Sequence, residues 1–226
     1  MQNIEDVKSY ESSKLYEPIL QQDDLLSIII SAENPEITVP FNLPQIQGNY
    51  EINNNQNGIK TYLIDNQGFI EFPVIGKIKL AGLTRTEANK KLVQNISEYI
   101  KNPGVNLRIL NYKVSVIGEV AKPGSFTIPN ERVTILEALS LAGDMTIYGI
   151  RKNILIIREI EGKKTYNRVD ITSSDFLNSP FYYLAQNDVV FVEPNKSKIN
   201  SSVIWTNSNL ILSGLTVLIS LLIFLK

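Results

Sequence analysis

The sequence predicts an α+β fold, in which two compact units follow one another and an apolar segment ends the chain. Three observations lead to this prediction. Short apolar runs alternate with turns rich in Gly, Pro, Asn and Asp, as in sheets with tight connections. Two Thr-x-x-Glu motifs each open a run with helical periodicity. Residues 203–225 contain no charged side chain.

Composition excludes several classes of protein. The 226 residues can bury a sizeable core, and 22 Lys and Arg against 23 Asp and Glu leave no basic surplus for nucleic acid. The chain has no His and no Cys, which excludes Cys/His metal sites, thiolate nucleophiles and Ser-His-Asp triads. Phosphate-loop and dinucleotide fingerprints are absent as well. We therefore expect no enzyme, no catalytic residue, no cofactor and no metal.

The first predicted unit covers residues 14–112 and follows a polar arm, residues 1–13. Asp24 to Ser31 reads as a strand, and the Pro- and Asn-rich stretch 33–57 as a long irregular loop. Residues 60–80 then predict two strands, with a turn at 65–68 and a second turn near Gly76.

A helix completes this unit. Thr84 and Glu87 form a capping box, in which each side chain bonds the backbone of the other residue. The predicted buried face has four members, the last of them left open: Ala88, Leu92, Ile96, and Tyr99 or Ile100. Residues 102–104 (Asn-Pro-Gly) are expected to stop the helix, and 105–109 to form a strand.

The second predicted unit, residues 113–195, repeats this arrangement. Its helix opens at a second capping box, Thr134 with Glu137, and stops at Gly143. Residues 153–160 and 164–171 are expected to pair as a hairpin. The remaining predicted strands are 113–120, 125–128 and 189–192. Residues 196–202 are interpreted as a linker.

Two Asp residues have the same local setting. Asp24 and Asp188 each follow a residue that tolerates the left-handed conformation, Asp23 and Asn187, and each precedes an apolar strand. We interpret them as turn residues that bond nearby backbone. The other candidate carboxylates have similar turn or cap contexts: Asp65, Asp170 and Asp175.

Aromatic residues leave one alternative open. Tyr182 and Tyr183 could stack on a sugar ring or pack against neighbouring residues, and packing is the more frequent role of such a pair.

The final segment, residues 203–225, predicts a transmembrane helix. As a helix its 23 residues span about 34 Å, against a hydrocarbon core of about 30 Å. Trp205 near one end and Lys226 at the other suit the two membrane interfaces. A buried core helix, the alternative, seldom runs so long without a charge.

One face of this segment is weakly polar. Asn209, Ser213, Thr216 and Ser220 recur at helical spacing and share that face. Small polar residues allow close packing of membrane helices. The same face could instead line a water-filled pore. Spacing alone leaves both interpretations open.

Two motifs resemble a known family. Residues 63–76 (LIDNQGFIEFPVIG) with 80–88 are similar to the signature of the outer-membrane polysaccharide export domain. Residues 116–124 (VIGEVAKPG), followed by 134–143, look like the start of an SLBB module, which has a β-grasp-like fold. The resemblance covers residues 14–195, and the order of the two motifs is specific.

This resemblance implies a polysaccharide export domain, an SLBB domain and a C-terminal transmembrane helix. It further implies a subunit of an outer-membrane, porin-like pore, a homo-oligomeric ring of about eight copies. The soluble domains would lie in the periplasm, and capsular or extracellular polysaccharide would pass through the ring. The stripe Asn209, Ser213, Thr216 and Ser220 would face the lumen. Implied partners are outer-membrane lipid, an inner-membrane polymerase and a tyrosine-kinase co-polymerase.

The chain departs from the family pattern in three ways. It carries one SLBB module where longer relatives have two, and Asp23 and Asn187 stand where a Gly is expected. The family's lipoproteins carry an amino-terminal lipidated Cys, and this chain has no Cys, so we expect residues upstream of Met1. The alternative hypothesis is a membrane-anchored periplasmic module that binds a ligand or glycan without forming a pore.

Overall fold

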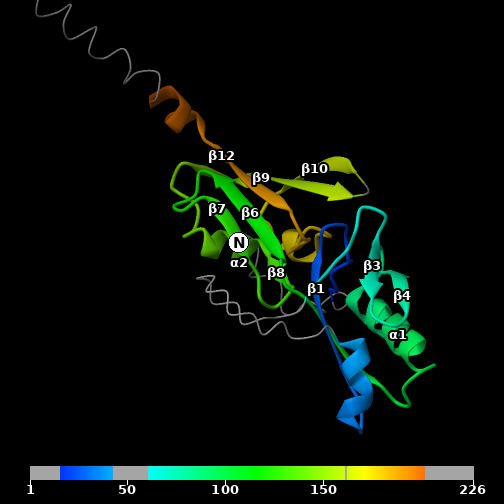
Figure 1. Ribbon diagram of the computed structural model, residues 1–226. Coiled ribbons are helices and arrows are strands. Elements are labelled where there is room, and N and C mark those ends of the chain that lie inside the picture. Colours follow the sequence, from blue (N-terminus) through cyan, green and yellow to red (C-terminus); the bar gives the residue numbers. More distant parts are fainter. Residues whose placement is uncertain (1–15, 43–60, 161, 202–226) are drawn as a thin grey trace, which may run out of the picture.

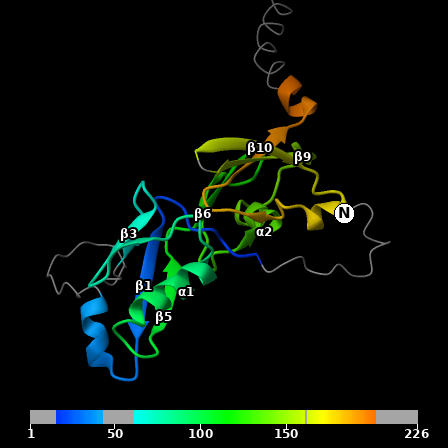
Figure 2. The ribbon, with the colours of Figure 1, turned by 90° about the vertical axis from the view of Figure 1, so that its right-hand side faces the viewer.

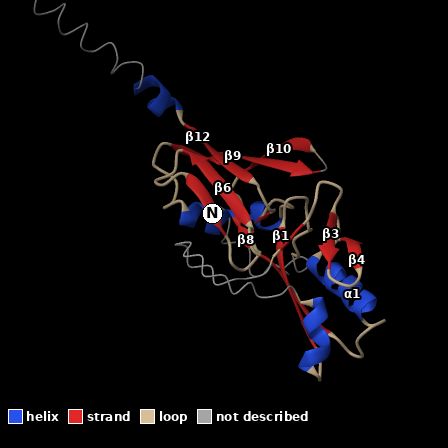
Figure 3. Cartoon of the chain, in the orientation of Figure 1, coloured by secondary structure: helices blue, strands red, loops and turns tan. Residues whose placement is uncertain are grey.

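A computed structural model describes residues 16–42, 61–160 and 162–201. Both predicted units are present as α+β arrangements, and the path of the chain runs from the blue strand β1 to the orange strand β12 (Figure 1). Each unit combines several strands with one α-helix and one 3₁₀ helix (Figure 3).

The first unit is built on a three-stranded antiparallel sheet. β1 (Leu25–Ser31) lies between β2 (Tyr62–Leu63) and β5 (Gly104–Ile109). β3 (Phe69–Phe72) and β4 (Gly76–Lys79) form a separate hairpin that ends at the predicted turn near Gly76.

Helix α1 (Arg85–Ile96) lies along β5 (Figure 2). Both halves of the predicted capping box are formed, which confirms its start at Thr84. Ile100 is buried and Tyr99 is 56% exposed, so Ile100 is the last member of the apolar face. The helix ends at Ile96, before the predicted stop at 102–104, and the Ser97 hydroxyl and N–H both donate to the Val93 carbonyl, at 2.7 and 2.9 Å.

The prediction of an irregular loop over 33–57 is wrong in its first part. Pro35–Phe41 forms a 3₁₀ helix, η2, which begins where the Asn34 side chain accepts from the Glu36 N–H at 3.0 Å. Phe41 is buried, and its ring lies 5.7 Å from that of Tyr99. A proline at the first helical position and an apolar anchor thus outweigh the loop composition. Residues 43–57 are not among the residues that the structure describes.

The second unit contains a five-stranded sheet in the order β10-β9-β12-β6-β7. Its strands are β6 (Lys113–Gly118), β7 (Gly124–Thr127), β9 (Gly149–Ile160), β10 (Lys163–Val169) and β12 (Val189–Pro194). β12 is parallel to β6, and the other pairs are antiparallel. The predicted hairpin of β9 and β10 is confirmed. Shorter elements complete the unit: β8 (Val133–Thr134), β11 (Tyr183–Leu184) and the 3₁₀ helix η3 (Ser174–Asn178).

Helix α2 (Ile135–Leu141) covers one face of this sheet. Alternate residues of β6, β9 and β12 point toward it and are fully buried: Val114, Val116, Ile154, Ile156, Val190 and Val192. The second capping box, Thr134 with Glu137, is formed, and Gly143 follows the helix with a φ of 74°. These features confirm the predicted bounds of the helix.

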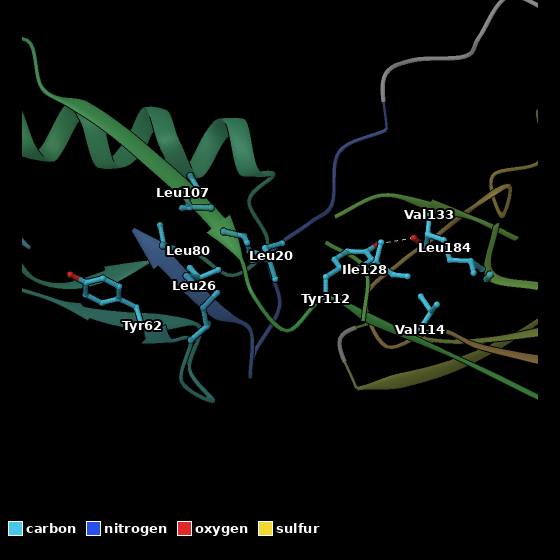
Figure 4. Packing of buried hydrophobic residues seen from close by; sticks show 14 of the residues in the cluster. Leu20, Leu26, Tyr62, Leu80, Leu107, Tyr112, Val114, Ile128, Val133 and Leu184 are labelled. Atoms are coloured by element: carbon cyan, nitrogen blue, oxygen red, sulfur yellow. Dashed lines mark hydrogen bonds between the residues drawn. The ribbon is translucent and has the colours of Figure 1, made fainter. Parts of the chain in front are cut away.

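Buried apolar residues of the two units form one continuous cluster (Figure 4). Leu20 and Leu26 belong to it from the first unit, Ile128 and Leu184 from the second, and Tyr112 from the segment that connects them. In Figure 4 Leu20 lies on the side of the first unit that faces Tyr112. The shared core fixes the two units to each other.

After β12 the chain is helical over 196–201, in the stretch predicted as a linker. Within residues 16–42, 61–160 and 162–201, no helix has the length and apolar character needed to cross a membrane. The segment predicted to do so, residues 203–225, lies outside these ranges.

Candidate functional site at the domain junction

The predicted pore-lining and membrane-interface residues lie outside the described part of the chain: Trp205, Asn209, Ser213, Thr216, Ser220 and Lys226. What the structure brings together instead is a polar junction between the two units. It is built from two similar turns, residues 20–24 and 184–188, and from the segment 110–112 that connects the units.

The two turns have the same geometry, as their sequence similarity predicts. Asp23 and Asn187 adopt φ values of 66° and 64°. The carboxylates of Asp24 and Asp188 each accept from the backbone N–H three residues earlier, both at 2.8 Å. Both carboxylates are fully buried. The interpretation of these Asp residues as turn residues is therefore confirmed.

The other candidate carboxylates are also turn residues. Asp65 accepts from the N–H groups of Gln67 and Phe69, and these bonds to backbone, that of Phe69 foremost, lower its pKa. Asp170 accepts from the hydroxyl and the N–H of Thr172, and the hydroxyl bond is the main reason that its pKa is lowered. Asp175 accepts from the Ser173 hydroxyl at the start of η3. Each carboxylate therefore stabilises its own turn.

Asn111 links both turns. Its side-chain oxygen accepts from the Leu25 N–H, and its amide donates to the Asp23 carbonyl, both at 2.9 Å. Its own carbonyl accepts from the Gln186 side chain at 2.9 Å. The Gln186 oxygen in turn accepts from the Lys113 N–H at 2.8 Å. One asparagine thus holds the first strand of one unit to the last turn of the other.

Arg158 on β9 pairs with Asp188 from the turn. The guanidinium bonds both carboxylate oxygens, at 2.7 to 3.1 Å, and it donates to the Tyr183 carbonyl. The Arg158 side chain is 14% exposed. Burial alone would lower the pKa of Arg158, but the bond and charge of Asp188 outweigh it and raise that pKa. Burial raises the pKa of the Asp188 carboxyl, although the bond and charge of Arg158 oppose the shift. The contact of the guanidinium with both carboxylate oxygens favours the ionised pair.

Aromatic side chains close the junction from the amino-terminal side. The rings of Tyr16 and Tyr183 stack with centroids 5.1 Å apart. Tyr112 donates to the Leu184 carbonyl at 2.7 Å, and Tyr16 donates to the same carbonyl at 3.1 Å. Tyr182 packs edge-on against Phe176 and Tyr183, so the pair Tyr182 and Tyr183 serves packing, as the more frequent role suggested.

Two buried carboxylates at the junction, Glu131 and Asp24, influence each other. Glu131, at a left-handed φ of 55°, accepts from the Ile109 N–H at 2.6 Å, while its other oxygen lies 3.9 Å from the guanidinium of Arg85. Asp24 lies near enough for this charge to act on it. Burial, above all, and the charges of Asp23 and Glu131 raise the pKa of Asp24 to about 6, although the Gln21 N–H bond opposes the shift.

Sequence reasoning missed Asn111, Glu131 and Arg158. Asp188, the partner of Arg158, lies 30 residues away, and Leu25, a partner of Asn111, lies 86 residues away. No short-range sequence pattern therefore indicates these contacts. The single signal was the similarity of the two Asp turns, which located Asp24 and Asp188 but not their partners.

Two shallow cavities lie outside the junction. One, of about 460 Å³, runs between α1 and β5 and presents Arg85, Asn89, Lys90 and Asn106. The other, of about 330 Å³, lies beside α2 and Ile171. Among the described residues, no group of three or more Asp and Glu side chains could hold a metal ion. Neither cavity contains the paired acidic groups that hydrolysis of a glycan requires.

Comparison with known proteins agrees with this architecture. The family model described as polysaccharide biosynthesis/export protein matches residues 12–110, and the SLBB domain model matches residues 112–192. An EPS I polysaccharide export outer membrane protein, EpsA, of Ralstonia solanacearum is 30% identical over 179 residues, covering 76% of this chain and 47% of the relative. EpsA of Ralstonia nicotianae is 33% identical over 141 residues, which cover 60% of this chain and 37% of that relative.

An export domain followed directly by an SLBB domain defines a class of polysaccharide transport proteins. The chain belongs to the polysaccharide biosynthesis/export family. Members of this family transport their polymer, which confirms the prediction that the chain is not an enzyme. The chain spans less than half the length of the curated relatives it matches.

Proposed function

We propose that the chain is a subunit of an oligomeric outer-membrane pore that conducts capsular or extracellular polysaccharide from the periplasm to the cell surface. The observation that carries this proposal is the order of its parts. An export domain and an SLBB domain share one core, and the helix 196–201 leads directly toward the uncharged segment 203–225. The relatives are named as outer-membrane export proteins, which supports the same location here.

The carboxy-terminal segment would form the pore wall. A helix satisfies its own backbone hydrogen bonds, so a barrel of helices can cross lipid. A hydrated sugar polymer needs a polar surface that binds it weakly. Asn209, Ser213, Thr216 and Ser220 supply amide and hydroxyl groups without charge, whereas the rest of that segment is largely apolar and suits lipid. Trp205 and Lys226 would lie at the two membrane interfaces.

The two folded units would build the periplasmic ring, of about eight copies in the resemblance. The rigid junction supports this role, because a closed ring requires each subunit to keep a fixed angle between its parts. The chain has no phosphate-loop motif, so energy for export would come from an inner-membrane polymerase and its tyrosine-kinase co-polymerase. The subunit itself would be a passive conduit.

Substitution of the proposed pore lining tests this function. Ser213→Leu with Thr216→Leu should abolish surface polysaccharide, because an apolar lumen excludes the hydrated polymer. The matched control is Asn207→Leu with Ser208→Leu, which also replaces two polar residues but lies off the stripe. Membrane fractionation would verify equal amounts of protein. Normal export by the first double variant would contradict the pore.

The alternative is a membrane-anchored module that binds a ligand or glycan without a pore. The cavity between α1 and β5 presents amide and basic groups that could bond a sugar. The particle mass of the full chain in mild detergent separates the two proposals. Light scattering corrected for bound detergent should give a closed multimer for the pore. A monomer or dimer at high concentration would favour the binding module.

A further inference from the structure

The loop between α2 and β9 presents an apolar side chain to solvent. Ile147 is 81% exposed, the largest value among the bulky apolar residues that the structure describes. Tyr148 beside it is 37% exposed. An isolated exposed Ile needs no explanation, but an exposed Ile followed directly by a partly exposed Tyr forms an apolar patch.

The loop holds Ile147 in a fixed position. Met145 before it is buried and pairs with Val120. The Thr146 N–H donates to the Glu119 carbonyl at 2.9 Å, and its hydroxyl donates to the Glu119 carboxylate at 2.8 Å. The Gly149 N–H closes the turn on the Thr146 carbonyl at 3.1 Å. Ile147 thus projects from a turn that is bonded on both sides.

This loop contacts the segment through which the chain leaves the second unit. The Asn195 N–H donates to the Tyr148 carbonyl at 2.7 Å. The Lys198 ammonium lies 5.2 Å from the centre of the Tyr148 ring and 4.0 Å from a Glu119 carboxylate oxygen. The helix 196–201 extends past the end of β12, away from the sheet (Figure 1). Exposed Lys196 and Lys198 lie on this helix.

We propose that the loop 144–148, together with Lys196 and Lys198, rests on the phospholipid surface of the membrane that the tail enters. The inference rests on the proposed function, because it takes residues 203–225 as a membrane span. A helix continued at 1.5 Å per residue would bring the start of the proposed span about 12 Å beyond Asn195. A headgroup layer is about 5–8 Å thick, so a side chain of the loop can reach it.

The chemistry of the patch suits this partner. Tyr is enriched at membrane interfaces, and an apolar side chain beside it can pack among the lipid headgroups. The two lysines are attracted to anionic headgroups. A second copy of the chain could also cover Ile147, but the position of the loop beside the exit of the tail favours lipid.

The absence of Cys from the chain allows a direct test. Ile147→Cys carries a single thiol for a polarity-sensitive fluorophore. Val39→Cys is the matched control, since Val39 is 68% exposed. It belongs to η2, which lies at the opposite end of the molecule from the helix 196–201 (Figure 2). The full chain would be reconstituted in vesicles of phosphatidylethanolamine and phosphatidylglycerol, with and without lipid bearing a nitroxide on its headgroup. We expect the nitroxide lipid to quench the label at 147 and not the label at 39.

Trp205, the single Trp of the chain, reports on the tail in the same samples. Quenching of Trp205 without quenching at 147 would overturn the lipid contact and leave the membrane segment standing. Quenching at neither position would overturn both the contact and the proposed membrane span. A blue-shifted label at 147 that the nitroxide lipid leaves unquenched would assign the loop to contact with another copy, which also overturns the inference.

Discussion

At the scale of single residues, Asp24 makes the stability of the protein depend on pH. Its carboxyl is fully buried and its pKa is raised from 3.8 to about 6. Between these two values the folded state binds the proton more tightly than the unfolded state does. The contribution of Asp24 is therefore greatest below pH 4 and is lost as the pH rises through 6, with an upper bound of about 3 kcal/mol.

Asp24→Asn tests this dependence. The amide oxygen can still accept from Gln21, so the variant should be more stable than the wild type at pH 7, by about 1–3 kcal/mol. The advantage should vanish near pH 4. Urea unfolding of the full chain in detergent, repeated across this range, measures the difference. An unchanged difference between pH 4 and pH 7 would contradict the raised pKa.

Arg158 and Asp188 give a second prediction at this scale. Arg158→Met leaves the Asp188 carboxylate buried and without its cation, so we expect a loss of about 3–5 kcal/mol in the free energy of unfolding. Arg168→Met is the control. It breaks a similar pair with Glu193, but the Arg168 side chain is 53% exposed, and exposed pairs are worth at most about 1 kcal/mol. Equal losses from the two variants would contradict the importance of burial.

At the scale of elements, Gly118 determines how closely β6 and β12 approach. Its φ is 94°, and an added Cβ would collide with the backbone carbonyl of Val192. Gly118→Ala should therefore cost several kcal/mol and lower the melting temperature of the full chain sharply. Gly162→Ala is the matched control, because Gly162 also has a positive φ, 73°, but open space around it. The control should lose about 1–2 kcal/mol through its backbone alone.

The sequence predicts elements wherever their signals are local. Both capping boxes, the glycine after α2 and the hairpin of β9 and β10 follow from residues a few positions apart. The position of β12 between β9 and β6 does not, because any apolar strand of its length could fill an edge as well as the centre. The partners of Arg158 and Asn111 could not be predicted either, because they are distant in the sequence. At η2 the composition indicated a loop, but the Asn34 cap and the buried Phe41 stabilise a 3₁₀ helix there.

At the scale of the whole molecule, Asn111 controls how firmly the two units are joined. Asn111→Ala removes its side-chain bonds to Leu25 and Asp23, which tie the connecting segment 110–112 to the first unit, and should cost about 2 kcal/mol. The bond from the Gln186 side chain to the backbone carbonyl of residue 111 remains. Asn106→Ala, an exposed asparagine on the adjacent β5, is the control and should cost less than about 0.5 kcal/mol. Urea midpoints of the full chain measure both. If the ring needs a fixed angle between the units, Asn111→Ala should also lower the fraction of closed multimers.

The central position of β12 also sets the order in which the protein can be completed during synthesis. The first unit has all its strands once the ribosome has passed Ile109, whereas the second sheet lacks its middle until Pro194 has emerged. Until then β6 and β9 each present an unpaired edge, the kind of surface that recruits other chains. A nascent chain halted before residue 189 would therefore be prone to aggregate. The exposed strand edges are paired only when β12, the last described strand, has been synthesised.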